Sequence, residues 1–152
     1  MGDYIMGMRK LVGHKCLIQC AASIIVVNEK NEILLGLRDD TLNWCYSGGS
    51  VEIDEKPEDC AKRELMEEMG LEALELEFFM INAGPEAHFV YPNGDEVSNV
   101  EVVYICRKYQ GQLKNVDGEM IELRFFDIDD LPSNLSKPIQ PVINEYLRRN
   151  KQ

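Results

Sequence analysis

The sequence predicts an α+β domain that combines apolar strands with amphipathic helices. Three observations support this class: two runs rich in Ile, Val and Leu near the beginning of the chain, a helix-patterned segment in the middle, and a closing segment with helical spacing. The chain has 152 residues, of which 45% are hydrophobic and 28% are charged, as in ordinary globular proteins. This length fits one domain, which we expect to span residues 1–152.

The first two strands are predicted at Cys16–Asn28 and Ile33–Arg38. The polar segment Glu29–Glu32 between them predicts a short turn that joins these strands. Two more strands are expected at Leu74–Ala83, where apolar and acidic residues alternate imperfectly, and at Asn99–Arg107, which is rich in Val, Tyr and Ile.

Three further elements complete the predicted order. Tyr91–Asp95 reads Tyr-Pro-Asn-Gly-Asp, in which Asn-Gly supplies the positive φ angles of a tight turn, so this segment predicts the tip of a β-hairpin. Leu123–Ile128 predicts a late strand. Ile139–Arg149 has apolar residues at helical spacing and predicts an amphipathic closing helix.

The middle helix is predicted over Pro57–Met69. Proline at a first helical position followed by acidic residues is typical of a helix start, and Gly70 is typical of a left-handed helix end. The expected buried stripe recurs every four residues and contains Ala61, Leu65 and Met69.

Three carboxylates share one face of this helix, because Glu64, Glu67 and Glu68 lie at positions i, i+3 and i+4. Each like-charge pair costs about 0.2–0.5 kcal/mol, and the negative end of the helix dipole adds to the repulsion. Arg63 offsets only part of it. A divalent cation such as Mg²⁺ or Mn²⁺, which prefers hard oxygen ligands, would neutralise the patch. The alternative is a solvated acidic face.

Composition and charge exclude several classes of protein. With 16 Lys and Arg against 27 Asp and Glu, the net charge of −11 disfavours unaided binding to a nucleic-acid backbone. No apolar stretch approaches the ~20 residues that span a membrane, and residues 1–11 lack the apolar core of a secretory signal, so we expect a cytoplasmic protein. The five cysteines form no C-x-x-C pair, so we expect buried thiols and a metal held only by oxygen.

The segment that begins at Gly49 has a more specific pattern. It reads GSVEIDEKPEDCAKRELMEEMGL: glycine, five residues, Glu55, seven residues, then Arg63-Glu64-Leu65-x-Glu67-Glu68-x-Gly70-Leu71. This 23-residue segment resembles the signature of the Nudix hydrolases at every position. The lead-in Trp44–Gly49 and the closing Phe126–Pro132 are also similar to this family.

Two positions near the signature depart from the family's usual pattern. Ser47 stands where proline is usual, and Asp54 stands where glycine is common. Aspartate tolerates left-handed dihedral angles better than most residues, so we expect the loop at Asp54 to stay intact. We expect neither residue to contact a presumed metal ligand.

The resemblance implies the Nudix fold, a mixed β-sheet sandwiched between α-helices. It also implies metal-dependent hydrolysis of a nucleoside diphosphate linked to another moiety, with substitution by water at phosphorus. By resemblance, one to three Mg²⁺ or Mn²⁺ ions are held by Glu64, Glu67, Glu68 and the Gly48 carbonyl. Arg63 orients the glutamates. The resemblance also implies a general base, which we expect to be Glu67 or Glu68, or a glutamate outside the signature such as Glu119 or Glu122.

The substrate side of the site is assigned to three residues. Arg38 resembles a family position that reaches phosphate groups, although a surface arginine that closes a strand is an equal alternative. Glu55 pins the loop or adds an outer ligand, and Glu122 lies in the region where some members place a catalytic glutamate. Trp44 and Tyr46 stack on the substrate or simply pack.

The substrate itself is not determined by the signature. We prefer ADP-ribose or a related sugar nucleotide, with a noncanonical nucleoside triphosphate as the alternative. A non-catalytic nucleotide-sensing module and a plain acidic interaction domain are the non-enzymatic readings. Sensing modules usually lose signature glutamates, whereas all are present here. We therefore expect a small-molecule partner, no nucleic-acid polymer, no membrane, and a homodimer, which is common for the family.

Overall fold

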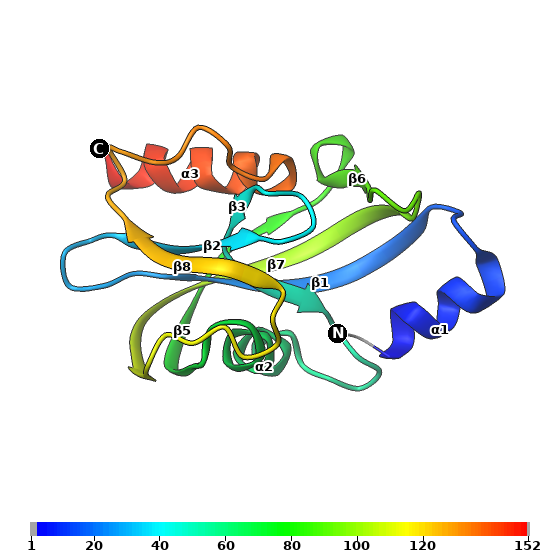
Figure 1. The fold of residues 1–152 in the computed structure, drawn as a ribbon, viewed down its shortest axis with the longest axis horizontal. Coiled ribbons are helices and arrows are strands. Elements are labelled where there is room, and N and C mark those ends of the chain that lie inside the picture. The colour runs from blue at the N-terminus through cyan, green and yellow to red at the C-terminus, as the bar shows by residue number, and fades with distance from the viewer. Residues whose placement is uncertain (1–2, 152) are drawn as a thin grey trace.

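The strands of the protein form two sheets, in a computed structural model that describes residues 3–151 (Figure 1). Residues 1, 2 and 152 of the predicted domain lie outside the described residues. The larger sheet has the strand order β4-β1-β7-β5, with β6 also paired to β7. Its strands are β1 (Leu17–Val26), β4 (Ser47–Ser50), β5 (Leu71–Asn82), β6 (His88–Val90) and β7 (Glu96–Gly111). The smaller sheet contains β3 (Trp44–Cys45), β2 (Ile33–Arg38) and β8 (Met120–Phe126) in this order.

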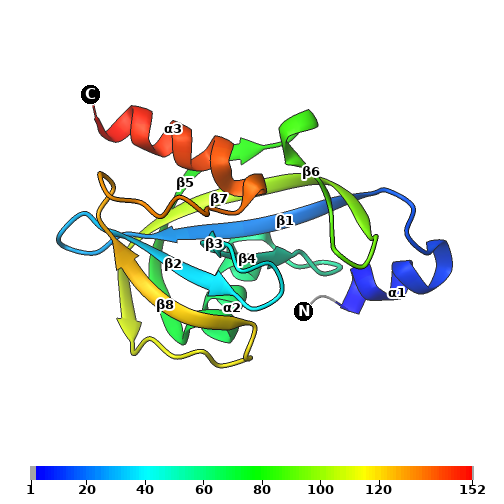
Figure 2. The same cartoon turned by 45° about the horizontal axis from the view of Figure 1, so that its top comes forward.

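Helices lie on both sides of these sheets. Helix α2 (Pro57–Met69) and helix α3 (Gln140–Asn150) cover opposite faces, and α1 (Asp3–Val12) lies at the end where β1 begins (Figures 1 and 2). Two short 3-10 helices, η1 (Pro85–Ala87) and η2 (Lys137–Ile139), precede β6 and α3. This arrangement confirms the predicted α+β sandwich. Within the described residues, no helix is both long and apolar enough to span a bilayer.

The larger sheet is mixed because β1 and β7 run parallel, from the pair Leu17 and Val97 to the pair Val26 and Cys106. Its other ladders are antiparallel. The two predicted first strands exist, but β1 pairs with β4 and β7, whereas β2 pairs with β3 and β8. An isolated bridge between Val27 and Ile33 connects the ends of the two strands. Their turn therefore links two sheets, because both edges of β1 are already occupied.

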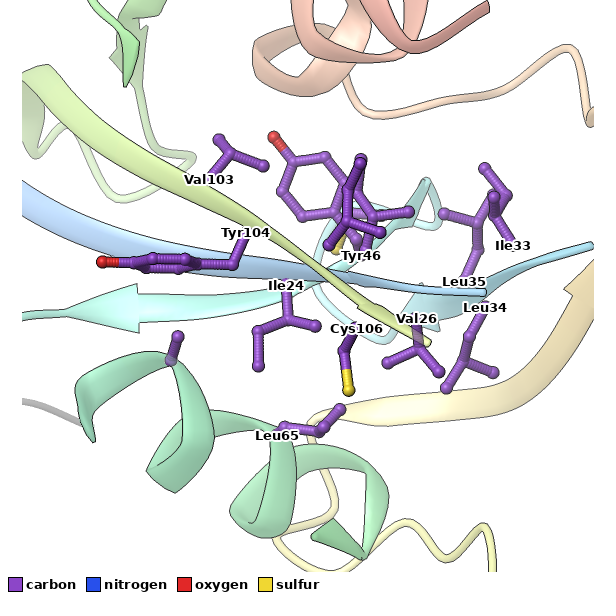
Figure 3. Packing of buried hydrophobic residues seen from close by; sticks show 14 of the residues in the cluster. Ile24, Val26, Ile33, Leu34, Leu35, Tyr46, Leu65, Val103, Tyr104 and Cys106 are labelled. Atoms are coloured by element: carbon purple, nitrogen blue, oxygen red, sulfur yellow. The ribbon is translucent and has the colours of Figure 1, made fainter. Parts of the chain in front are cut away.

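The core fills the space on both sides of the larger sheet (Figure 3). Ile24, Cys106 and Leu65 pack together on the side of α2, and Val103 and Tyr46 lie on the side of α3. All five side chains are buried. Alternate residues of β7 thus face opposite halves of the core, so a polar residue in register with Val103 faces the α3 side.

The predicted bounds of β2 and α2 are confirmed, whereas β5, β7 and β8 each begin three residues earlier than predicted. The three added residues of β7 include polar Glu96 and Ser98, which pair with Val90 and His88 of β6. The ladders therefore extend beyond the runs of apolar residues from which the strands were predicted. Elements without a long apolar run were not predicted at all, and these are α1, β3, β4 and β6. The expectation of buried thiols is wrong for two cysteines, since Cys16 and Cys20 are exposed.

Local backbone chemistry fixes the two ends of the signature helix. Lys56 is the N-cap and makes no side-chain capping bond, so the start depends on Pro57 and the acidic first turn. At the other end Gly70 has φ 76° and its N–H donates to the Met66 carbonyl at 3.1 Å. Asp54, in the loop before the helix, has φ 63°, as its tolerance of this conformation predicts.

We predict that Gly70→Ala lowers the free energy of unfolding by about 1–2 kcal/mol, because the left-handed conformation is costly for a residue with a Cβ atom. That Cβ would also lie 2.9 Å from the Gln112 carbonyl oxygen. Gly7→Ala in α1 is the control: its Cβ meets open space, so the change is neutral or stabilising by up to ~1 kcal/mol. Urea unfolding of both variants measures this, and equal effects would contradict the prediction.

Candidate active site

Helix α2 places two carboxylates in the interior. Glu64 and Glu68 are one turn apart and only 5% and 2% exposed, which is rare for glutamate. The side chain of Glu67 is 39% exposed. The predicted patch therefore consists of two buried carboxylates and a third that reaches solvent.

The two buried carboxylates lie against the edge strand β4. The N–H of Gly48 donates to Oε1 of Glu68 at 3.0 Å, and the Ser47 hydroxyl donates to the same atom at 2.9 Å. A Cβ on Gly49 would lie 2.3 Å from the carboxyl carbon of Glu64, so only glycine allows this approach. The expectation that Ser47 contacts no presumed ligand is wrong: its hydroxyl supplies a hydrogen bond that proline could not.

Arg63 connects the helix to the loop before it. Its guanidinium donates to both carboxylate oxygens of Glu55 at 2.8 and 2.9 Å and to Oε1 of Glu64 at 2.9 Å. It also bonds the Ser50 carbonyl at 3.2 Å and lies 3.4 Å from Glu67. Glu55 further accepts the N–H of Glu52 and thereby closes the loop. Arg63 thus fixes the positions of two α2 glutamates relative to the loop and β4.

The pKa of Glu68 is raised to about 8, mainly by burial and also by the neighbouring charges of Glu64 and Glu119, while the hydrogen bonds from Ser47 and Gly48 lower it. Burial likewise raises the pKa of Glu64. These shifts indicate a site with too little positive charge for its carboxylates. Hard oxygen donors gathered around such a deficit fit a divalent cation of the Mg²⁺ type.

Two adjoining cavities open beside this patch. The outer cavity, about 300 Å³, is bordered by Glu64 and Glu119, and the inner cavity, about 140 Å³, extends between the sheets as far as Glu101. Residues that line both are Gln19, Arg38, Asp40, Gly48, Gly49, Glu68 and Tyr91. We call the continuous space that they form the cleft.

The inner end of the cleft is built around a buried carboxylate. Glu101 accepts hydrogen bonds from the hydroxyl of Ser23 at 2.6 Å, the hydroxyl of Tyr46 at 3.0 Å and the amide of Asn82 at 3.1 Å. Burial raises its pKa. Together with the ring of Phe89, these groups give the inner cavity an aromatic wall and a polar floor.

One wall of the outer cavity comes from α1 and from the turn between β6 and β7. Ile5, Met6 and Arg9 contribute from the helix, and Tyr91 and Asp95 contribute from the turn. The Arg9 side chain is buried and donates to the carbonyls of three residues near this junction, Gly13, Lys15 and Glu96. The sequence analysis predicted the turn but not the helix that faces it.

The residues predicted for the substrate side have different positions. Arg38 lines both cavities and is held by a bidentate ion pair with Asp40, with distances of 2.8 and 2.9 Å. Glu55 is engaged by Arg63. Glu122 lies within β8 opposite Leu37, forms an ion pair with Arg124 and lines neither cavity.

Glu119, by contrast, lies just before β8 and borders the outer cavity. Glu101 and Ser23 were missed, although each is a polar residue inside an apolar strand. Glu101 is also in register with the buried Val103 and Ile105, which places it on the inward face of β7. This combination was the signal in the sequence.

Comparison with known proteins assigns this site to a family. The family model of the NUDIX domain matches residues 18–149. The chain belongs to the Nudix family. A MutT NUDIX hydrolase from Burkholderia pseudomallei has the same fold, with a TM-score of 0.72 and 23% identity over 85% of this chain and 98% of that one. The signature glutamates described above thus lie on a Nudix fold, in a family of pyrophosphohydrolases.

Two curated Nudix relatives differ in how much of their length is matched. An 8-oxo-dGTP diphosphatase from Haemophilus influenzae is 30% identical over 86% of this chain and 95% of that protein. An NAD-capped RNA hydrolase NudC from Vibrio vulnificus is 28% identical over 78% of this chain and 41% of that protein. The chain spans 35% to 41% of the length of several relatives, so their whole-protein activities do not transfer directly.

We predict that Glu55→Gln destabilises the protein in a pH-dependent way. The hydrogen bonds from Arg63 lower the pKa of Glu55 from 4.5 to about 2. A lowered folded-state pKa stabilises the native state above the unfolded-state pKa, and this contribution disappears as the pH falls through the folded-state value. The stability difference from wild type in urea should be largest above pH 5 and shrink toward pH 3. Glu77→Gln, at an exposed position, is the control, and a pH-independent difference would contradict the prediction.

Proposed function

We propose that the protein hydrolyses the phosphoanhydride bond of a small nucleoside diphosphate derivative in the presence of Mg²⁺ or Mn²⁺. The observation that carries the proposal is the buried pair Glu64 and Glu68 against the glycines of β4, at the edge of a cleft that leads to Glu101. Burying two like charges is unfavourable unless a cation compensates them. The Nudix family and its named diphosphatase member supply the class of reaction.

We assign the cation ligands to Glu64, Glu67, Glu68 and the carbonyl of Gly48. When bound, a divalent cation supplies positive charge that offsets the negative charge developing on the phosphate oxygens. Arg63 is a positioning residue, because it holds two of the glutamates and the loop in one arrangement.

Glu67 is our choice for the general base. Oε1 of Glu68 accepts two hydrogen bonds from β4 at 2.9 and 3.0 Å, and Oε1 of Glu64 accepts one from Arg63 at 2.9 Å. The contacts of Arg63 with the Glu67 oxygens are longer, at 3.4 and 3.5 Å. The Glu67 carboxylate is the most solvent-accessible of the three and is therefore best placed to take a proton from an attacking water. Glu119 at the border of the outer cavity is the alternative outside the signature, and Glu122 is no longer a candidate.

The phosphate chain of the substrate is assigned to the part of the cleft shared by both cavities. Arg38 is oriented there by Asp40, so its remaining guanidinium hydrogens offer a fixed donor to an anionic oxygen. The nucleobase of the substrate is assigned to the inner cavity, where Phe89 offers an aromatic ring for stacking and Glu101 and Asn82 offer polar atoms. The cleft has charged groups for phosphates at its outer part and an aromatic ring beside polar atoms at its inner end. This combination fits a nucleotide better than a simple phosphate ester.

For the substrate class we now favour a noncanonical purine nucleoside triphosphate over ADP-ribose. The relative that this chain covers at 95% of its length is an 8-oxo-dGTP diphosphatase. A buried carboxylate that accepts hydrogen bonds, such as Glu101, suits the N–H groups of a guanine-type base. A sugar nucleotide stays the second candidate, since it would share the phosphate and base positions.

We predict that Glu67→Gln reduces kcat by about 100-fold or more, because the amide cannot accept the proton. The fold should be retained, since the change is isosteric and relieves repulsion on α2. Asp59→Asn, an exposed change on the same helix, is the matched control and should keep near-wild-type turnover. Steady-state hydrolysis with Mg²⁺ measures both variants, and full activity of Glu67→Gln would exclude Glu67 as the base.

We also predict which substrate is cleaved. With Mg²⁺ the protein should release diphosphate from 8-oxo-dGTP and hydrolyse dGTP, ADP-ribose, other sugar nucleotides and NADH more slowly, and a chelator should abolish turnover. Mass spectrometry identifies each product. Preferential cleavage of ADP-ribose would return the assignment to sugar nucleotides. Binding of nucleotides without any turnover would instead indicate a sensing module.

A further inference from the structure

Three chemically different metal-binding side chains meet at one end of the larger sheet, outside the catalytic patch. Cys16 immediately precedes β1, His88 is the first residue of β6 and Glu96 is the first residue of β7. Their ligand atoms all lie within 4.8 Å of one another. No spacing motif in the sequence connects these residues, so only the fold brings them together.

The strand register explains why they meet. The parallel ladder pairs Leu17 with Val97, so one step earlier along both strands Cys16 lies beside Glu96. The antiparallel ladder pairs Val90 with Glu96, and His88 is two residues from Val90 and therefore on the same face. Three neighbouring strands thus present a thiol, an imidazole and a carboxylate to one point on one face.

We propose that Cys16, His88 and Glu96 form a second metal site, which binds Zn²⁺ through one sulfur, one nitrogen and one oxygen and leaves a fourth position open. Borderline-soft Zn²⁺ takes this mixture of donors, whereas Mg²⁺ requires oxygen donors. The site therefore differs in chemistry from the carboxylate patch on α2. This proposal departs from the sequence-based expectation that a metal is held only by oxygen.

The distances fit this assignment after small side-chain rotations. Bonds of about 2.0–2.3 Å at tetrahedral angles place ligand atoms about 3.3–3.8 Å apart. Nε2 of His88 lies 2.5 Å from Oε2 of Glu96, and the widest separation in the group is below 4.8 Å. Cys16 and His88 are exposed, so their rotamers are free to adjust, and Arg9 fixes the backbone of Glu96 through its carbonyl.

The surroundings connect this site to the cleft. Cys16 lies between α1 and β1, and His88 and Glu96 flank the turn that contributes Tyr91 and Asp95 to the outer cavity. At present, within the described residues, this junction is held by the bonds of Arg9 and by the pair of His14 and Asp95 at 2.8 Å. A bound Zn²⁺ would tie the two parts of the cleft wall together by coordination bonds.

Titration of the reduced protein with Co²⁺ tests the proposal independently of hydrolysis. A thiolate ligand gives Co²⁺ an intense charge-transfer absorption that oxygen ligands do not give, so the signal reports Cys16 and not the α2 glutamates. We expect one equivalent of this signal in the wild type and its displacement by Zn²⁺. Cys16→Ser should abolish it. Cys20→Ser is the matched control, because Cys20 is also exposed but lies about 13 Å further along the strand, and should retain the signal.

The other two ligands give the second arm of the experiment. His88→Ala and Glu96→Gln should each weaken Co²⁺ binding by about tenfold or more while the circular-dichroism spectrum stays that of the wild type. Absence of the charge-transfer band in the wild type, its persistence in Cys16→Ser, or its insensitivity to His88→Ala would each overturn the proposal. None of these outcomes would bear on the hydrolase assignment, which depends on other residues.

Discussion

The close approach of α2 to β4 is the constraint on which the rest of the cleft depends. The helix comes so near that no side chain fits at Gly49, and the carboxylate of Glu68 is bound by the backbone of Gly48. A glycine-rich edge strand contributes little packing of its own. Strand β4 is therefore held by its ladder with β1 and by hydrogen bonds to the helix, and these contacts determine where the buried carboxylates point.

Several features of this arrangement are unfavourable for the stability of the fold. Like charges are gathered at the negative end of a helix, two of them are buried, and a helix start lacks a capping side chain. Arg63 compensates part of this negative charge, and its guanidinium also connects the helix to the loop through hydrogen bonds to Glu55. Local rules of stability are broken at the site to which we assign the hydrolysis, and an apolar core around Leu65 and Met69 on the same helix compensates.

The sequence predicted α2 and β2 to the residue because their signals are local: apolar periodicity, proline, and glycine at a helix end. It could not distinguish Glu119 from Glu122, because both precede a strand that was predicted to begin at Leu123. In the structure β8 begins at Met120, so Glu122 lies within the strand. Non-local features were also beyond reach. The contact of Ser47 with Glu68 needs the sheet and helix in place, and the part of α1 in the cleft wall depends on tertiary packing.

The parallel pairing of β1 with β7 has a consequence for how the molecule is made. Residues that touch across this ladder, such as Leu17 and Val97, are separated by the whole signature segment. Contacts of such long sequence separation form slowly, since the intervening chain must first be ordered. During synthesis on the ribosome, β1 leaves the exit tunnel before β7, so one edge of β1 stays unpaired until β7 has also been made. The cleft is complete only after that point, and the unpaired edge can form incorrect contacts with other chains in the meantime.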